Sequence, residues 1–494
     1  MILVAITIAG TVAILYGPVL SFALTGDSYQ WIQHAHLAAH RPALLLADLD
    51  TFYRPSTTWT LVTDRLVWGG YDARGYRTTS LALHGIVALA LAVAGRRLGL
   101  GWIAAAAVGA VWLTSPFTDE SAFVVAYRFQ PLLLLSWLVL IATWPHNGES
   151  WSRSRIVLAA AAVLAAAAAK ETWVVTPALV AALEYERSRS WRAILTPVIL
   201  VGFAVALYLT LYFVAFPTSK SYFELGPHIA AKVPSQLAAF FYLEESVPDG
   251  LSLTWKGVVA AVMFMALVVG CVKWRIPGTV VAIVLFVVPS VPTMLVPYMP
   301  QRYLSIPYAG FVLVVALWMT GVGVRYPRWQ VATRGGCAAA AGLVIVIGSV
   351  TVRADLDDHR MMAGAHERLL SEAFDVRGSV LEGAPVAVVR DEQTTPLVEI
   401  ARSTVGYPKL FFVRQDDPYG LIDAAALFEW VVADEEIHVE HVDDWVRGCE
   451  GLSGRLLVHR NGGFVDFGVE GDIATEASRW LSSGRGVRMI QVSP

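Results

Sequence analysis

The chain has 494 residues, of which 56% are hydrophobic and only 16% charged, and its mean hydropathy is +0.56. Soluble domains are about 45–50% apolar and 25% charged, so this composition excludes a cytosolic enzyme. Residues 1–352 carry 23 Lys/Arg and 15 Asp/Glu, a net +8, whereas residues 353–494 carry 14 and 25, a net −11. The two parts therefore face different surroundings. Neither offers the clustered cations that nucleic acids demand.

Long apolar runs fill the first part of the chain. Residues 1–24 are about as long as the ~20 residues of a membrane helix and lack the basic start of a signal peptide, which predicts a retained span. Further runs cover residues 78–95, 101–116, 122–144, 155–185, 194–216, 256–272, 276–296, 302–319 and 336–352. The sequence therefore predicts a polytopic α-helical membrane protein.

The run at residues 155–185 has an ambiguous length. At ~1.5 Å per residue it reaches about 46 Å, too long for one span and short for two. Arginines flank both of its ends, and cytoplasmic loops collect Lys and Arg. We therefore predict a hairpin of two short helices with Lys170 and Glu171 at its outer tip. The total becomes eleven spans, with a cytoplasmic N-terminus and an extracytoplasmic C-terminal part.

The composition becomes soluble from residue 353. Residues 384–389 and 409–413 are typical of short strands, and residues 396–405 and 421–432 of helices. Residues 454–459 and 463–467, joined through Asn461-Gly462, predict a β-hairpin. We expect two domains: a membrane domain at residues 1–352 and a small extracytoplasmic α/β domain at residues 353–494.

Acidic residues gather in the first outer loop. Asp27 follows the first span directly, and a carboxylate at the outer membrane surface is able to accept a proton from a hydroxyl. The alternative is that Asp27 caps a helix starting at Ser28. Asp48 and Asp50 have a D-x-D spacing that chelates a divalent cation. That cation is the one cofactor the pattern indicates, and a chance pair in a loop is the alternative.

Three cations are expected on the same side. Arg128 lies eight residues after Glu120, about two helical turns, and beside Asp119 and Glu120 it suits phosphate recognition. Lys170 stands with Glu171 at the hairpin tip, and Arg302 begins a span after a Pro-rich loop. The alternatives are that Arg128 only anchors a helix at the interface and that the Lys170–Glu171 pair only hydrates a turn. As a group, these cations suit a lipid-phosphate leaving group.

The motifs and their order resemble the membrane glycosyltransferases of the GT-C fold, in particular the O-mannosyltransferase branch and its tetratricopeptide-bearing relatives. The similar segments are Asp27 after span one, Tyr53-Arg54-Pro55-Ser56, Gly75-Tyr76 with Leu81, Leu83 and His84, Pro116 with Glu120 and Arg128, Lys170-Glu171-Thr172 with Pro177, and Arg302-Tyr303-Leu304 with Pro307. The chain departs from the family at Ser28, Arg77, Ser80, Ser115, Gln130 and Gln301, and it lacks the tetratricopeptide tail.

The resemblance implies an integral protein of the plasma (inner) membrane that transfers a sugar with inversion. The donor would be a mannose-like hexose or another sugar on a polyprenyl phosphate, and the acceptor a hydroxyl of a protein Ser/Thr, a glycan or a lipid. Asp27 would be the base, and Arg128, Lys170 and Arg302 would bind the departing phosphate. The residues expected to shape the site are Tyr53, Arg54, His84, Asp119, Glu120, Glu171 and Tyr303, although a His buried in a helix is more often a packing residue.

Two other classes of protein remain alternatives. A transporter or lipid flippase would show inverted halves with paired broken helices at mid-membrane. A receptor-like scaffold would bind a partner through its acidic tail and would be indifferent to Asp27.

Overall fold

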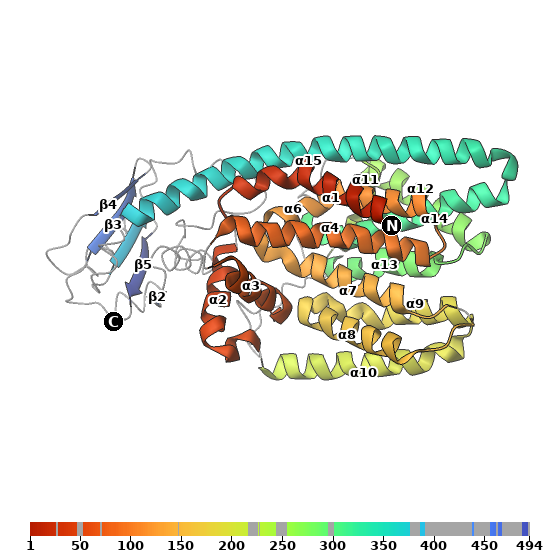
Figure 1. The fold of residues 1–494 in the computed structure, drawn as a ribbon, viewed down its shortest axis with the longest axis horizontal. Coiled ribbons are helices and arrows are strands. Elements are labelled where there is room, and N and C mark those ends of the chain that lie inside the picture. Colours follow the sequence, from red (N-terminus) through yellow and green to blue (C-terminus); the bar gives the residue numbers. More distant parts are fainter. Residues whose placement is uncertain are drawn as a thin grey trace.

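The computed structural model describes residues 1–25, 28–46, 53–69, 72–146, 148–215, 226, 228–243, 254–294, 301–375, 386–390, 437–438, 455–460, 463–466 and 487–492. Most of these residues form a bundle of long helices that lie side by side, with a small β-sheet beyond one end (Figure 1). The helices α2 and α3 lie at that same end of the bundle (Figure 1).

Eleven described helices overlap the apolar runs of the sequence. They are α1 (Ile2–Tyr16), α4 (Ala73–Arg97), α5 (Trp102–Leu113), α7 (Phe129–Thr143), α8 (Arg153–Ala169), α9 (Thr176–Ser188), α10 (Trp191–Ala215), α12 (Trp255–Lys273), α13 (Thr279–Met294), α14 (Ser305–Arg325) and α15 (Gln330–Asp375). Shorter helices connect them: η1 (Gly17–Ser21), α2 (Ser28–His40), η2 (Pro42–Leu46), α3 (Pro55–Trp68), α6 (Pro116–Phe123), η3 (Val125–Arg128), η4 (Glu171–Val175), α11 (His228–Phe240), η5 (Gln301–Leu304) and η6 (Pro327–Trp329).

Seven described stretches are long and apolar enough to cross a membrane. They are Ile2–Ser21, Ala73–Arg97, Val125–Thr143, Trp191–Thr210, Trp255–Lys273, Arg302–Arg325 and Ala338–Met361, and α5 and α13 are shorter apolar helices. The protein is therefore an integral membrane protein, while the count of eleven spans and their sidedness stay predictions.

Burial separates the inner helices of the bundle from the outer ones. Within an apolar window of 18 residues, 78% of the residues are buried in Val125–Thr143 and 61% in Arg302–Arg325, but only 11% in Trp191–Thr210. On α10, Leu200 and Phe203 are 67% and 71% exposed. Large apolar side chains on an outer surface are costly in water and favourable in lipid. The outer helices therefore face hydrocarbon, and α7 and α14 form the core.

The predicted hairpin at residues 155–185 is present as two helices with a break between them. The helix α8 ends at Ala169, and Lys170 has an extended backbone (φ −163°, ψ 149°). The chain then forms η4 and enters α9, whose first turn holds Pro177, a residue suited to a helix start. The position of the break at Lys170 is confirmed.

The long helix α15 continues past residue 353 and ends at Asp375. The residues after it form a mixed five-stranded sheet of β1 (Val386–Arg390), β2 (Ile437–His438), β3 (Arg455–Arg460), β4 (Gly463–Asp466) and β5 (Val487–Val492), in the order β2-β5-β1-β3-β4. The pairing of Arg460 with Gly463 confirms the predicted hairpin. The predicted strand at residues 409–413 and the helices at 396–405 and 421–432 lie outside the described residues. The α/β domain and its boundary therefore stay predictions.

Close backbone contact joins α13 to α14. A Cβ added to Gly310 would lie 2.3 Å from the backbone nitrogen of Phe286, so only glycine fits at this crossing. Small residues allow such close approach between membrane helices, where van der Waals contact drives association.

We expect the substitution Gly310→Ala to destabilise the bundle. The added methyl group forces the two helices apart, and overpacking of this kind costs about 1–3 kcal/mol. Thermal unfolding of the detergent-purified protein measures the effect. Gly342→Ala on α15 is the matched control, because no atom lies within 4 Å of the added Cβ there. Equal unfolding temperatures for the two variants would contradict the packing argument.

Candidate functional site

Three cations from distant parts of the chain meet on aromatic rings. Arg54, just before α3, lies over Phe129 with its Cζ 3.9 Å from the ring centroid. The Nζ of Lys170 lies 5.2 Å from the centroid of Phe129 and 4.1 Å from that of Tyr303. The Cζ of Arg302 lies 5.3 Å from the centroid of Tyr303 and 4.3 Å from that of Tyr127. All these distances fall within the ~6 Å range of cation–π attraction. We call this group (Arg54, Tyr127, Phe129, Lys170, Arg302 and Tyr303) the cation–aromatic cluster.

Two glutamates hold the arginines of the cluster. Glu120 on α6 accepts hydrogen bonds from the Nη1 of Arg302 at 2.7 Å and from its backbone nitrogen at 2.8 Å. Glu171 accepts from the Nε and Nη2 of Arg54 at 3.3 and 3.4 Å. Among the described residues, Glu120 and Glu171 each pair with one arginine of the cluster.

Lys170 is the cation of this cluster that makes no ion pair with a described carboxylate. It lies at the hairpin tip between α8 and η4, and its side chain is 95% buried. Burial, together with repulsion from Arg54 and Arg302, holds the pKa of Lys170 well below the ordinary lysine value, and Glu171 opposes this only in part. An anion bound between the three cations would relieve this repulsion. The arrangement is therefore suited to a phosphate group.

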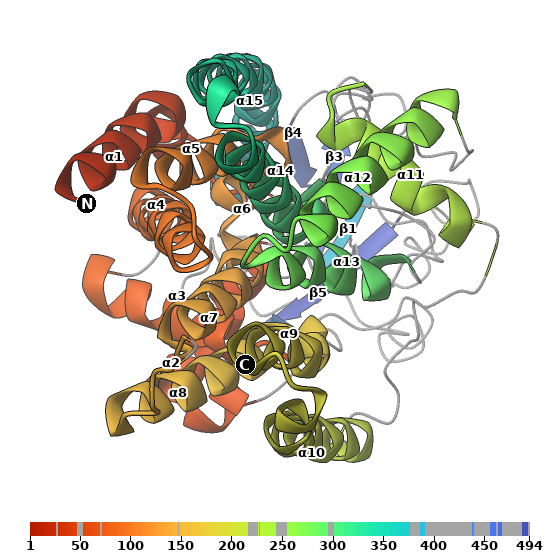
Figure 2. The ribbon, with the colours of Figure 1, turned by 90° about the vertical axis from the view of Figure 1, so that its right-hand side faces the viewer.

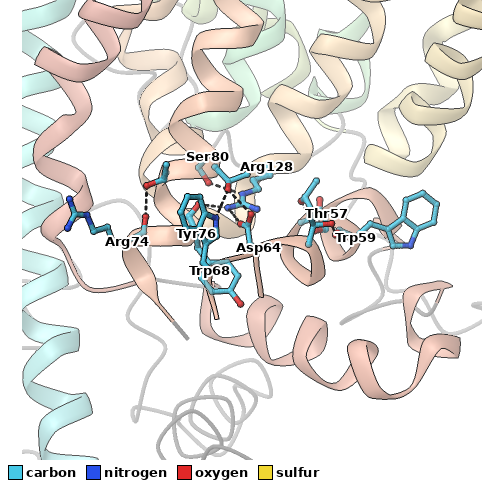
Figure 3. A network of polar contacts seen from close by, with 12 residues as sticks. Thr57, Trp59, Asp64, Trp68, Arg74, Tyr76, Ser80 and Arg128 are labelled. Carbon is cyan, nitrogen blue, oxygen red and sulfur yellow. Dashed lines mark hydrogen bonds and ion pairs between the residues drawn. The ribbon is translucent and has the colours of Figure 1, made fainter. Parts of the chain in front are cut away.

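Arg128 is engaged elsewhere. Its side chain is fully buried and forms an ion pair with Asp64 of α3, with 2.6 Å between Nη2 and Oδ2 (Figure 3). Its Nε donates to the hydroxyl of Ser80 at 2.8 Å, and its Nη2 also contacts the carbonyl of Tyr76. The hydroxyl of Thr79 donates to Asp64 at 2.6 Å. These bonds join α3 and α4 to the start of α7, next to Phe129. The phosphate role expected of Arg128 from the sequence stays a prediction.

Two further sequence-predicted residues lie in other surroundings. His84 is buried between Tyr16 and Trp112, with ring centroids 5.2 and 4.8 Å away, which fits the packing alternative. Asp119 on α6 is buried beside Asp355 of α15. Burial, Asp355 and Glu120 together raise the pKa of Asp119 well above its usual range. Asp119 thus links α6 to α15 through its contact with Asp355.

Of the remaining candidates, the structure describes only Tyr53. Tyr53 is half-buried next to Arg54, and its ring lies 6.3 Å from that of Tyr208 on α10. Asp27, Asp48 and Asp50 lie outside the described residues. Thr25 and Ser28, the neighbours of residues 26 and 27, are buried, and α2 contacts η3. Among the described residues, no group of three His, Cys, Asp or Glu side chains is able to hold a metal ion.

Comparisons with known proteins identify the fold of the chain. Neither a scan against protein-family models nor a search of curated proteins finds a match. Two solved structures of ArnT from Cupriavidus metallidurans, one in the apo state and one bound to undecaprenyl phosphate, are similar to this chain with a TM-score of 0.55 each. Sequence identity is 14% and 13%, and each match covers 98% of this chain and 97% of that chain. The chain has the GT-C fold. This confirms the fold expected from the motifs, whereas the O-mannosyltransferase branch is not supported by the comparison.

We expect Asp64→Asn to destabilise the protein strongly, because it leaves the buried guanidinium of Arg128 without a counter-charge. Breaking a buried ion pair from one side costs about 3–5 kcal/mol. The double variant Asp64→Asn/Arg128→Met removes both charges and should unfold at a higher temperature than Asp64→Asn alone. Glu149→Gln, at the partly exposed pair with Arg155, is the control and should change little. A double variant no more stable than the single one would refute the ion-pair account.

Proposed function

We propose that this protein is an inverting glycosyltransferase that transfers a sugar from a polyprenyl-phosphate donor to a hydroxyl acceptor. The observation that carries the proposal is the cation–aromatic cluster, which keeps a surplus cation, Lys170, in a buried place at the end of a membrane bundle. The GT-C fold supports it, because an ArnT structure of the same fold holds undecaprenyl phosphate.

In this proposal the cluster binds the phosphate that links the sugar to the lipid. Negative charge grows on that phosphate as its bond to the sugar breaks, so fixed cations stabilise the transition state more than the ground state. Glu120 and Glu171 hold Arg302 and Arg54 in place through the bonds described above. Such preorganised cations need not rearrange during the reaction, and burial strengthens their effect.

Aromatic residues next to the cluster offer a path for the lipid. Trp173 of η4 lies 5.2 Å from Tyr208 of α10 between ring centroids, and Tyr208 lies 6.0 Å from Tyr212. We propose that the first isoprene units of the donor leave the cluster along these rings toward the outer helix α10. Aromatic rings are favoured at membrane interfaces because they combine an apolar body with a polar tip.

Asp27 is the proposed general base. The acceptor oxygen attacks the anomeric carbon and its proton passes to the Asp27 carboxylate. The bond from that carbon to the phosphate oxygen breaks, the electron pair stays on the phosphate, and the configuration inverts. The burial of Thr25 and Ser28 and the contact of α2 with η3 support a place for this loop near the cluster.

The finer parts of the proposal come from the motif resemblance. The sugar is a mannose-like hexose, and the acceptor is a protein Ser/Thr, a glycan or a lipid. A divalent cation at Asp48 and Asp50 stays an additional proposal. The protein would lie in the plasma (inner) membrane with the cluster and residues 353–494 on the extracytoplasmic side.

We expect Asp27→Asn to lower turnover by about 10²-fold or more, because an amide cannot accept the proton. The assay follows radiolabelled sugar moving from polyprenyl-phosphate donors, and unchanged thermal unfolding serves as the folding control. Asp48→Asn/Asp50→Asn, measured with and without a chelator, separates a metal role from a base role. Wild-type turnover in Asp27→Asn would eliminate the proposed base. If the protein in liposomes moves a lipid or a solute across the membrane and transfers no sugar, the transporter alternative is favoured.

We expect donor affinity to fall as the pH rises through the lowered pKa of Lys170. The pKa of Lys170 is lowered in the free protein, and a bound phosphodiester favours the ammonium form, so donor binding takes up a proton. Affinity is therefore highest below the lowered pKa and decreases, by at most about tenfold per pH unit, toward the ordinary value of 10.5.

Binding of a non-transferable donor analogue to the full chain measures this dependence. The linked phosphodiester keeps one charge across the range, so the slope reports on the protein. In Lys170→Arg the guanidinium stays charged and the slope should disappear, whereas Lys170→Ala should weaken binding at neutral pH. The same slope in wild type and Lys170→Arg would exclude Lys170 as the titrating phosphate ligand.

A further inference from the structure

An apolar groove runs between α5, α14 and α15, and the residues at the end of α11 also line it. Its volume is about 240 Å³, and Thr320 and two tyrosines supply the hydroxyls among otherwise apolar lining residues. The hydroxyl of Thr320 already donates to the carbonyl of Ala316 at 2.9 Å. None of the described residues that line the groove is charged. Apolar cavities of this kind stay free of water, so at membrane depth the groove admits hydrocarbon.

The three helices leave this space because they meet at one end and diverge from there. A Cβ added to Gly348 of α15 would lie 2.3 Å from the carbonyl oxygen of Thr114, at the end of α5. The indole nitrogen of Trp112 donates to the carbonyl of Ser305 at 2.9 Å and ties α5 to the start of α14. Away from these contacts, alanines on all three helices line the groove and leave it open.

The length of the groove fits one leaflet of a bilayer. Its lining on α14 extends from Tyr308 to Thr320, about 18 Å at the rise of an α-helix. The hydrocarbon core of a bilayer is about 30 Å thick, so one leaflet contributes about 15 Å. A single acyl chain from the leaflet at the Tyr308 end would fill the groove.

The groove has a polar end that is suited to a lipid ester. The Tyr242 hydroxyl is buried and lies near the hydroxyls of Tyr308 and Ser115, but no hydrogen bond of ordinary length joins it to a described residue. Tyr242 directly follows the last turn of α11 with φ 56°, a left-handed conformation that is strained for a residue other than glycine. An ester carbonyl accepts hydrogen bonds and cannot donate them, so it would satisfy the buried tyrosine hydroxyl.

The groove and the cation–aromatic cluster lie on different sides of the start of α14. Tyr303 faces Lys170, whereas Tyr308, five residues and about 140° further around the helix, packs on Phe117 at 5.1 Å. Viewed along the bundle, α5 and α15 lie on one side and α8 and α10 on the opposite side (Figure 2). A polyprenyl chain that leaves the cluster past Tyr208 therefore departs from the far side of the molecule.

We propose that this groove binds one acyl chain of a membrane phospholipid, with the ester carbonyl at the hydroxyl of Tyr242. The bound lipid is separate from the sugar donor, and the proposal does not depend on the reaction. The polar end of the groove lies close to the candidate site. Tyr308, which lines the groove, packs on Phe117, and Phe117 is about one helical turn before Glu120, the partner of Arg302. The lipid thus packs behind the helix that positions Arg302.

The test is photo-crosslinking of the full-length protein in nanodiscs of phosphatidylcholine with a diazirine in the acyl chain. We expect label on groove residues such as Val315 and Met319 in several-fold excess over Leu200 and Phe203, which are exposed on α10. A second arm uses a polyprenyl phosphate with a diazirine in its chain. Even labelling of all lipid-facing helices, or stronger labelling of the groove by the polyprenyl probe, would overturn the proposal.

Two substitutions sharpen the result. Ala316→Trp fills the groove and should abolish most labelling there, whereas Ala161→Trp, on the exposed face of α8, should leave it unchanged. Tyr242→Phe keeps the ring and removes the hydroxyl, so retention of labelled lipid against dilution should fall about fivefold, as for one lost hydrogen bond. Unchanged groove labelling in a folded Ala316→Trp variant contradicts the proposal. If that variant does not fold, unchanged lipid retention in Tyr242→Phe contradicts it instead.

Discussion

Buried charge governs the arrangement of this protein. Burying an ionised group inside a helical bundle costs free energy unless other groups compensate its charge. The cations of the candidate site are compensated in different ways. Arg302 and Arg54 are held by Glu120 and Glu171, and Lys170 lies against two aromatic rings. Among the described residues, Lys170 makes no ion pair with a carboxylate, and an anionic ligand would compensate its charge.

A second buried pair provides the rigid support for that arrangement. Arg128 and Asp64 connect the first outer segment, through α3, to the inner helix α7, and Phe129 follows Arg128 directly in the chain. The ring on which Arg54 and Lys170 lie is thereby fixed by its neighbour. Arg128 thus has a structural partner of its own directly beside a ring of the cation–aromatic cluster.

The sequence predicted the parts of the molecule that depend on hydropathy and local charge. A membrane helix must be apolar over its whole length, so the spans are visible in composition, and the break at Lys170 followed from arginines at both ends of a long run. Partners in three dimensions were less accessible. Asp64 lies in an amphipathic helix of the first loop, where nothing local distinguishes it as the counter-charge of Arg128. Tyr127 and Phe129 resembled ordinary residues of a span, and Arg54 was expected only to shape the site, because cation–aromatic contacts leave no spacing pattern.

The helix α15 is continuous for 46 residues, about 69 Å at the usual rise, and passes from the membrane bundle toward the strands. Asp355, within this rod, lies against Asp119, the neighbour of the glutamate that orients Arg302. The same continuous helix therefore contacts α6 beside Glu120 and extends a further 20 residues, between five and six helical turns, toward the strands.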